Sequence, residues 1–571
     1  MARTVWRRPS TTLFVLAAST IAWAAPLSLA ADSASLHERV DSLIGAAHAG
    51  PVAERTGDAE FARRVYLDLT GRIPPVAELR TFLAETAADK RASLVDRLLA
   101  SHEYARHMQI TFDCMWMERR GDKHVPAAEW QDYLRKSFAL NKPLNQLIRE
   151  ILSADGTVPA LRPAAKFYLD REAEPIQLTR DISRLFFGMD LQCTQCHDHP
   201  LLDDYKQNDF YGLFAFLNRS VLFTPKGQPA VLGEKAEGDA NYKSVFDPET
   251  NHAAGPHLPR AAAIEEPRYA DGQAYIVPPA DGIRPVPKHS RREQLAALAT
   301  DGANSAFNRN LANRLWAMLM GRGIVHPVGL HHAGNPPSHP ALLDMLAAEL
   351  VAMKFNTKAF LRELALSETY QRSSQAPESA EGAELPPDTF AVAAIKPLTA
   401  EQLTASMLEA TGSSAARRAA LESQLTADPR LHQILQADGK RAALHDSMLE
   451  QAAFDLVAAN LGAFVALFAK AQPQSEGFEV TVHQALFLAN AEPLRSWLRP
   501  GGGNLVERLI SITDAELLAE ELYLSILSRL PNGEEAAEAI ELISSGSDDR
   551  PAAVAQLAWA LLASAEFRLN H

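Results

Sequence analysis

The sequence predicts a mainly α protein with two helical domains joined by a proline- and glycine-rich, partly β segment. Apolar residues recur every three or four positions on both sides of the chain's middle, as on the buried face of an amphipathic helix. Residues 221–290 hold ten prolines and six glycines, roughly twice the share in the whole chain, which is typical of turns and irregular structure. With 571 residues, the chain is also too long for one ordinary hydrophobic core.

Residues 1–30 are predicted to be a signal peptide. The start is basic, with Arg3, Arg7 and Arg8, and residues 13–25 form an apolar stretch. The small residues Ser28 and Ala30 follow, just before the expected cleavage point. This order is typical of secretory leaders, and we expect the mature chain to begin at Ala31 or Ala25. The pair Arg7-Arg8 leaves Sec and twin-arginine export both open. No later segment is expected to reach membrane-spanning length, so the mature protein is predicted to be exported, periplasmic or otherwise extracytoplasmic.

Residues 31–220 are predicted to form the first helical domain. Its helices are expected where apolar residues lie three or four apart, namely at Phe61, Val65 and Leu69, at Leu94, Leu98 and Leu99, at Leu144, Ile148 and Ile151, and over 176–187. Gly71, followed by Pro74 and Pro75, is predicted to end the first of them, because glycine readily adopts the left-handed conformation that closes a helix.

Residues 221–290 are predicted to connect the two domains, with short strands near 221–224 and 274–277. Residues 291–571 are predicted to form the second helical domain, because helix signals return there. Leu342, Leu346 and Leu350 form an apolar stripe that follows Pro340. Two residue pairs also have capping-box spacing, Thr399 with Gln402 and Asn532 with Glu535.

Charge and composition exclude some classes of function. The net charge of −14 repels phosphate backbones, so a nucleic-acid partner is not expected. Three cysteines are too few for a disulfide-built scaffold. The sequence contains no P-loop, no glycine-rich dinucleotide turn, and no HExxH or GxSxG motif. It therefore assigns no catalytic residue.

One motif has a specific chemical meaning. Cys193-Thr194-Gln195-Cys196-His197 is a CxxCH sequence. Two thiols at this spacing can both form thioether bonds to one haem, and the adjacent histidine can then bind the iron as proximal ligand. The motif therefore predicts a covalent haem c held by Cys193, Cys196 and His197.

Other chemistry fits the same residues. The two cysteines could form a structural disulfide or redox pair, since export would place them where thiols oxidise. They could also bind zinc together with His197 and His199, although these residues lie close together for a four-ligand site. The sixth haem ligand cannot be read from the sequence; Met108, Met115, Met117 and Met189 are candidates by sequence proximity alone. The third cysteine, Cys114, lies among large apolar residues and is predicted to be a buried free thiol.

The blocks around the motif resemble the core of planctomycete cytochrome-type exported proteins, which pair two domains of unknown function, families 1549 and 1553. The resemblance to family 1549 is carried by Arg63–Gly71, Ile73–Pro75, Val95–Ser101, Cys193–Pro200 and Tyr205–Leu217. The resemblance to family 1553 is carried by Asn313–Ala317, Gly321–Val325, Asn335–Pro340, Ser367–Gln371, Leu398–Gln402, Gln484–Phe487, Leu522–Leu524, Leu527–Arg529 and Glu566–His571.

The resemblance implies a large helical exported protein, often encoded beside a second exported protein that could be its partner. Together with the motif it leads to one functional hypothesis: an exported protein with one covalent c-type haem for electron transfer or haem-dependent redox chemistry, working with a redox partner. The alternative hypothesis is a non-enzymatic exported binding or assembly protein with a structural CxxC disulfide or metal site.

Overall fold

The computed structural model describes residues 34–47, 50–380, 385–427, 439–469, 481–545 and 549–571, with the backbone alone for 439–443 and 545. The predicted leader, residues 1–30, lies outside the described residues. The remainder is mainly α, with small two-stranded antiparallel sheets, which confirms the predicted fold class. Contacts within Leu36–His571 form one compact unit.

The first part of the chain is a run of helices that match the apolar periodicity. Its α-helices are α1 (Leu36–Ala47), α2 (Asp58–Thr70), α3 (Val76–Ala84), α4 (Lys90–Ala100), α5 (His102–Met117), α6 (Ala127–Ala139), α7 (Leu144–Ser153), α8 (Lys166–Leu169), α9 (Pro175–Phe186) and α10 (Gln207–Leu217). Short 3₁₀ turns cover Pro159–Leu161, Pro163–Ala165 and Cys193–Gln195. As predicted, α2 ends at Gly71, whose φ of +74° is left-handed and whose N–H donates to the carbonyls of Tyr66 and Leu67.

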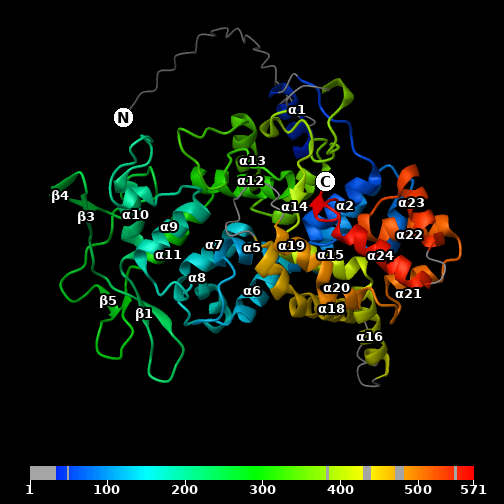
Figure 1. Cartoon of the computed structure of the whole chain (residues 1–571). Helices are drawn as coiled ribbons and strands as arrows, with labels where there is room; N and C mark the ends of the chain where they lie inside the picture. The colour runs from blue at the N-terminus through cyan, green and yellow to red at the C-terminus, as the bar shows by residue number, and fades with distance from the viewer. Residues whose placement is uncertain (1–33, 48–49, 381–384, 428–438, 470–480, 546–548) are drawn as a thin grey trace, which may run out of the picture. The chain divides into compact units, whose positions relative to one another are not determined.

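The predicted connecting segment contains three small hairpins. The pairs are β1 (Ser220–Phe223) with β2 (Val231–Glu234), β3 (Ala240–Ser244) with β4 (Asp247–Ala254), and β5 (Tyr275–Val277) with β6 (Val286–Pro287). The strands include the two that the sequence predicted. Figure 1 shows β3 and β4 beside α10, and residues of these elements are in contact.

Helices resume at Arg291, where the sequence placed the boundary. They are α11 (Arg291–Thr300), α12 (Ser305–Met320), α13 (Pro340–Ala352), α14 (Thr357–Leu366), α15 (Ala400–Ala410), α16 (Ser413–Ala427), α18 (Gly439–Phe468), α19 (Val482–Asn490), α20 (Glu492–Trp497), α21 (Leu505–Ile510), α22 (Ala515–Leu527), α23 (Gly533–Ser545) and α24 (Arg550–Ala563). Further 3₁₀ turns cover Glu378–Ala380 and Pro387–Thr389, and β7 (Lys396–Pro397) pairs with β8 (Leu569–Asn570). Both predicted caps form, at Thr399 with Gln402 and at Asn532 with Glu535.

The hydrophobic core does not follow the predicted domain boundaries. One large cluster joins side chains before residue 221, such as Phe61 and Trp116, to side chains after residue 290, such as Trp316 and Leu346. A second cluster is built from C-terminal helices but also includes Leu67 of α2. Residues 221 and 290 therefore mark a change in local structure, while side chains from both flanking regions share one core.

One helix is longer and more apolar than the sequence analysis expected. Leu444–Phe468, within α18, has the length and composition of a membrane-spanning helix, and it packs against α15 and α16. A helix in a soluble protein can pass the same test. The expectation that no later segment reaches this length and hydropathy is wrong, and the absence of a membrane span stays a prediction.

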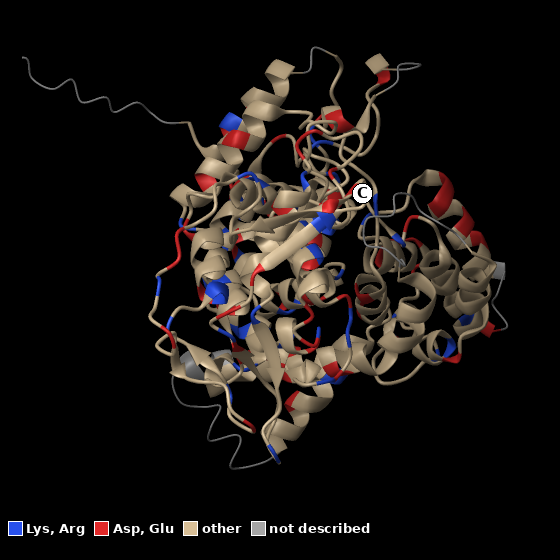
Figure 2. Cartoon of the chain, turned by 90° about the vertical axis from the view of Figure 1, so that its left-hand side faces the viewer, with Lys and Arg blue, Asp and Glu red and all other residues tan. Residues whose placement is uncertain are grey.

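Figure 2 shows acidic and basic positions interspersed on the face in view.

Candidate functional site

The CxxCH segment lies between α9 and α10. Cys193–Gln195 form a 3₁₀ turn, and Cys196 follows it directly. Side chains three residues apart eclipse one another in a 3₁₀ turn, so Cys193 and Cys196 lie on the same side of this segment. Both cysteines are exposed and neither is in a disulfide. Two thiols on the same side of a short segment can both reach one ligand.

Two neighbouring elements hold the segment in place. The carbonyl of Gln195 accepts hydrogen bonds from Gln207 Nε2 and Tyr211 Oη of α10, both at 3.2 Å. The N–H of Val245, at the tip of the β3–β4 hairpin, donates to the carbonyl of Cys196 at 3.0 Å. The motif is therefore fixed by a helix on one side and a hairpin tip on the other.

His197 has the geometry of a histidine that can bind a metal through Nε2. Its Nδ1 lies 2.6 Å from the carbonyl oxygen of Asp198. A carbonyl can only accept, so Nδ1 carries the proton in the neutral ring and Nε2 is left as the acceptor. A histidine that binds a metal through one ring nitrogen usually donates the N–H of its other ring nitrogen to an oxygen, often a backbone carbonyl.

Exposed apolar side chains surround the motif. Phe246, at the hairpin tip, is 78% exposed, and its ring centroid lies 4.9 Å from that of His197. Val245 and Leu201 are 60% and 86% exposed. Large apolar side chains gathered at the surface indicate a region that a ligand or partner covers. The same-side thiols, the His197 tautomer and this apolar rim together fit a covalent haem.

The candidate sixth ligands pack away from solvent. Met108 and Met117 are fully buried in the large core cluster, and Met115 is partly buried against it. The Met117 sulfur also accepts a hydrogen bond from Arg171 at 3.3 Å. Met189 is buried in a small cluster with Leu191, Tyr205 and Phe210. These contacts explain the four methionines as packing residues.

His199 has a local structural role. Its Nδ1 accepts hydrogen bonds from the backbone N–H groups of Leu201 and Leu202, both at 3.2 Å. Over the described parts of the chain, no three His, Cys, Asp or Glu side chains are grouped to hold a metal ion. The zinc alternative therefore has no preformed ligand set among those residues, and it stays an untested alternative.

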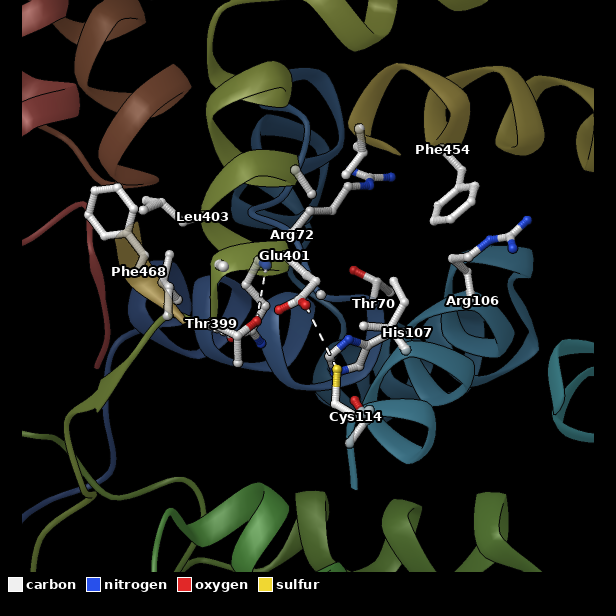
Figure 3. Close-up of a pocket in the computed structure, with 18 of the residues that line it drawn as sticks. Thr70, Arg72, Arg106, His107, Cys114, Thr399, Glu401, Leu403, Phe454 and Phe468 are labelled. Atoms are coloured by element: carbon white, nitrogen blue, oxygen red, sulfur yellow. Dashed lines mark hydrogen bonds between the residues drawn. The ribbon is translucent and has the colours of Figure 1, made fainter. Parts of the chain in front are cut away.

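A second site, which the sequence analysis missed, is a cavity of about 740 Å³. It lies between α5 and the helices α15, α16, α18 and α19 (Figure 3). The end of α2 also contributes: Gly71 lacks a side chain, and a Cβ there would come within 2.5 Å of His107 Nδ1. The lining residues come from segments up to several hundred positions apart and form no local pattern, so no motif could have revealed them.

The polar groups deepest in this cavity are not poised for nucleophilic chemistry. Burial lowers the pKa of His107 to about 4, so the ring is neutral at pH 7. Burial, with the Glu401 carboxylate as the next cause, raises the pKa of Cys114 to about 12. Its thiol lies 3.8 Å from Glu401 Oε1. Cys114 is a free thiol, as predicted, but it is partly rather than fully buried.

Comparison with known families agrees with the order of blocks along the chain. Residues 40–221 match the family described as PSCyt2, protein of unknown function (DUF1549). Residues 291–543 match the family described as PSD1, protein of unknown function (DUF1553). No curated protein and no solved structure matches the chain. The chain therefore combines a DUF1549 region, which contains the CxxCH segment, with a DUF1553 region that follows it.

Proposed function

We propose that this protein is exported and carries one covalent c-type haem, which serves electron transfer or haem-dependent redox chemistry. The observation that carries the proposal is the 3₁₀ turn that puts Cys193 and Cys196 on one side, with His197 directly after it. Covalent attachment through two cysteines needs this arrangement, since both sulfurs must reach one ring edge while the histidine reaches the iron.

Each residue of the motif has a separate task in this proposal. Cys193 and Cys196 hold the haem through thioether bonds, for which both sulfurs must start reduced, and His197 Nε2 is the proximal ligand. The Asp198 carbonyl would keep the His197 proton on Nδ1, and Phe246, beside the His197 ring, would add apolar surface next to the haem. When bound, the haem supplies one-electron redox chemistry. An exported redox partner, encoded nearby or elsewhere, completes the proposal.

The test is covalent haem on the protein matured in a bacterial host that attaches haem to other c-type cytochromes. We expect haem stain to stay with the chain on a denaturing gel, because thioether bonds survive denaturation. Cys193→Ser combined with Cys196→Ser should abolish the stain. Cys114→Ser is the matched control, since it removes the third thiol and should leave the stain unchanged.

Two histidine variants separate the proximal ligand from its neighbour. His197→Ala should keep covalent haem but change the absorption spectrum and reduction potential, because the axial ligand is lost. His199→Asn should leave the spectrum unchanged, since its side-chain oxygen can still accept from Leu201 and Leu202. A folded, colourless wild-type protein from that host would overturn the proposal. Zinc content and free-thiol titration would then distinguish the metal site from the structural disulfide of the alternative hypothesis.

A further inference from the structure

We infer that the cavity between α5, α15, α16, α18 and α19 binds an organic anion with an apolar body, of which a medium-chain carboxylate is the simplest example. The cavity shares no residue with the CxxCH segment. Its volume of about 740 Å³ is within the range of about 300–1,000 Å³ that is usual for small-molecule sites. The inference is therefore independent of the proposed haem.

The apolar body is indicated by the cavity wall. Its larger apolar side chains are Ile110 of α5, Leu403 of α15, Phe454 and Val457 of α18, and Phe468 at the end of α18. Figure 3 shows Phe468 and Leu403 on one side of the cavity and Phe454 on the other, with Arg72 between them. A ligand in this space touches apolar groups on both sides, and burying its own apolar surface there is favourable.

The anionic group is indicated by the charged residues of the lining. The lining contains five arginines and three glutamates: Arg72, Arg106, Arg119, Arg418 and Arg568, against Glu103, Glu401 and Glu450. Glu409 pairs with Arg72 and Arg418 from outside the lining. His107 and Cys114 are neutral, as described above. Arginines outnumber glutamates in the lining of this partly enclosed space, which favours a ligand with an anionic group.

The position of the anionic group follows from how tightly each arginine is held. Arg106 and Arg119 each form a hydrogen bond of 2.9 Å to a carboxylate, Glu450 and Glu401 respectively. Arg418 is held loosely, because its closest carboxylate contacts are 3.5 Å to Glu409 and 4.0 Å to Glu103.

Arg72 is held loosely too. It contacts Glu103 at 3.3 Å and Glu409 at 3.5 Å, and among the described residues its Nε has no hydrogen-bond partner. Good N–H···O bonds are about 2.7–3.2 Å long, so Arg72 and Arg418 keep unused donor strength. We therefore place the ligand's anionic group at Arg418, the more exposed of the two, with Arg72 behind it.

The experiment is calorimetric titration of the purified mature protein with decanoate, 1-decanol and decyltrimethylammonium, each below its aggregation concentration. We expect decanoate to bind at one site per chain and more tightly than 1-decanol, and we expect the cation not to bind. Arg418→Ala should weaken decanoate at least about tenfold, the usual effect of losing a charge-assisted hydrogen bond. The matched control is Arg417→Ala, which changes the exposed neighbour on the same helix, outside the lining, and should leave the affinity unchanged.

A second variant tests the apolar part of the site. Val457 is a partly exposed lining residue, so Val457→Trp should fill the cavity without disturbing the core and abolish binding of both decanoate and 1-decanol. The inference is overturned if wild type binds none of the three probes, if the cation binds as well as decanoate, or if Arg418→Ala and Arg417→Ala behave alike. Haem stain and absorption spectrum should be the same in all these variants, so failure here leaves the haem proposal standing.

Discussion

Lys396→Met tests a buried ion pair that connects regions far apart in the sequence. Lys396, in β7, places Nζ 2.5 Å from Oδ1 of Asp68, in α2, and the two side chains are 17% and 4% exposed. The Asp68 carboxylate also accepts hydrogen bonds from Tyr370 Oη at 2.9 Å and from Asn570 Nδ2 at 2.8 Å. Three donors thus satisfy one buried negative charge, and Lys396 is the only one of the three that is itself charged; Arg64 adds a smaller Coulombic contribution.

The magnitude follows from what each variant leaves behind. Methionine removes the positive charge and leaves the Asp68 carboxylate with two neutral donors, so we expect unfolding free energy to fall by about 3–5 kcal/mol. Asp68→Asn should cost less, because the Lys396 side chain as a whole is more exposed than that of Asp68 and its Nζ still donates to the carbonyl of Leu319 at 2.8 Å. The double variant should cost less than the sum of the two single variants, since the uncompensated charge is then absent.

The assay is urea unfolding of wild type, both single variants and the double variant, monitored by circular dichroism. The dependence of the unfolding free energy on urea concentration is compared first, and the free energies extrapolated to water afterwards. The matched control is Lys136→Met. Lys136 pairs with Asp132 at 2.6 Å, but the side chains are 66% and 41% exposed, so its loss should cost less than about 1 kcal/mol. If Lys396→Met cost no more than Lys136→Met, or if the two single effects simply added, the reasoning about burial would be refuted.

Two further predictions follow from the structure. Trypsin should first cut after Arg268, because this arginine is exposed in irregular backbone between β4 and β5. The two fragments should still elute together from a sizing column, since they share one core. First cleavage inside α2, or separation of the fragments, would contradict this. The hydrogen bonds from Arg529 hold the pKa of Glu535 below its ordinary 4.5, so ionised Glu535 stabilises the fold above about pH 4.5 and this contribution is lost as the pH falls below that value. Arg529→Met should therefore reduce the acid-induced loss of unfolding free energy between about pH 6 and about pH 3.5, and an unchanged pH profile would count against it.

Features that depend on a few consecutive residues were predictable from the sequence. The end of α2 at Gly71, the cap of α15 at Thr399 and the change of structure at Arg291 each rest on local backbone preferences. The CxxCH segment belongs to the same class, because its chemistry depends on spacing alone. Its surroundings do not: Phe246 approaches His197 only because the β3–β4 hairpin folds back over the motif, and nothing in its own neighbourhood signals this.

Contacts between residues far apart in the sequence were not predictable from local patterns. Arg63 of α2 donates to the carbonyl of Phe567 at 2.9 Å, a partner some five hundred residues away. A composition change at 221–290 indicates where helices stop, but it carries no information about which side chains pack across that stretch. The boundaries predicted between the two helical domains rested on local composition and periodicity, whereas the shared core is a property of the tertiary packing.

The two sites make different physical demands, and the chain meets them in different ways. The haem proposed for the CxxCH segment would have to come close to a redox partner, and the segment is exposed, with exposed apolar side chains beside it. Selective binding of a small anion needs partial enclosure, because water screens an exposed charge, and the arginine-lined cavity provides it. Since the sites share no residue, Cys193→Ser with Cys196→Ser should leave decanoate affinity intact, and Val457→Trp should leave the haem spectrum intact. Loss of both properties in either variant would indicate that the two sites depend on one cooperative core.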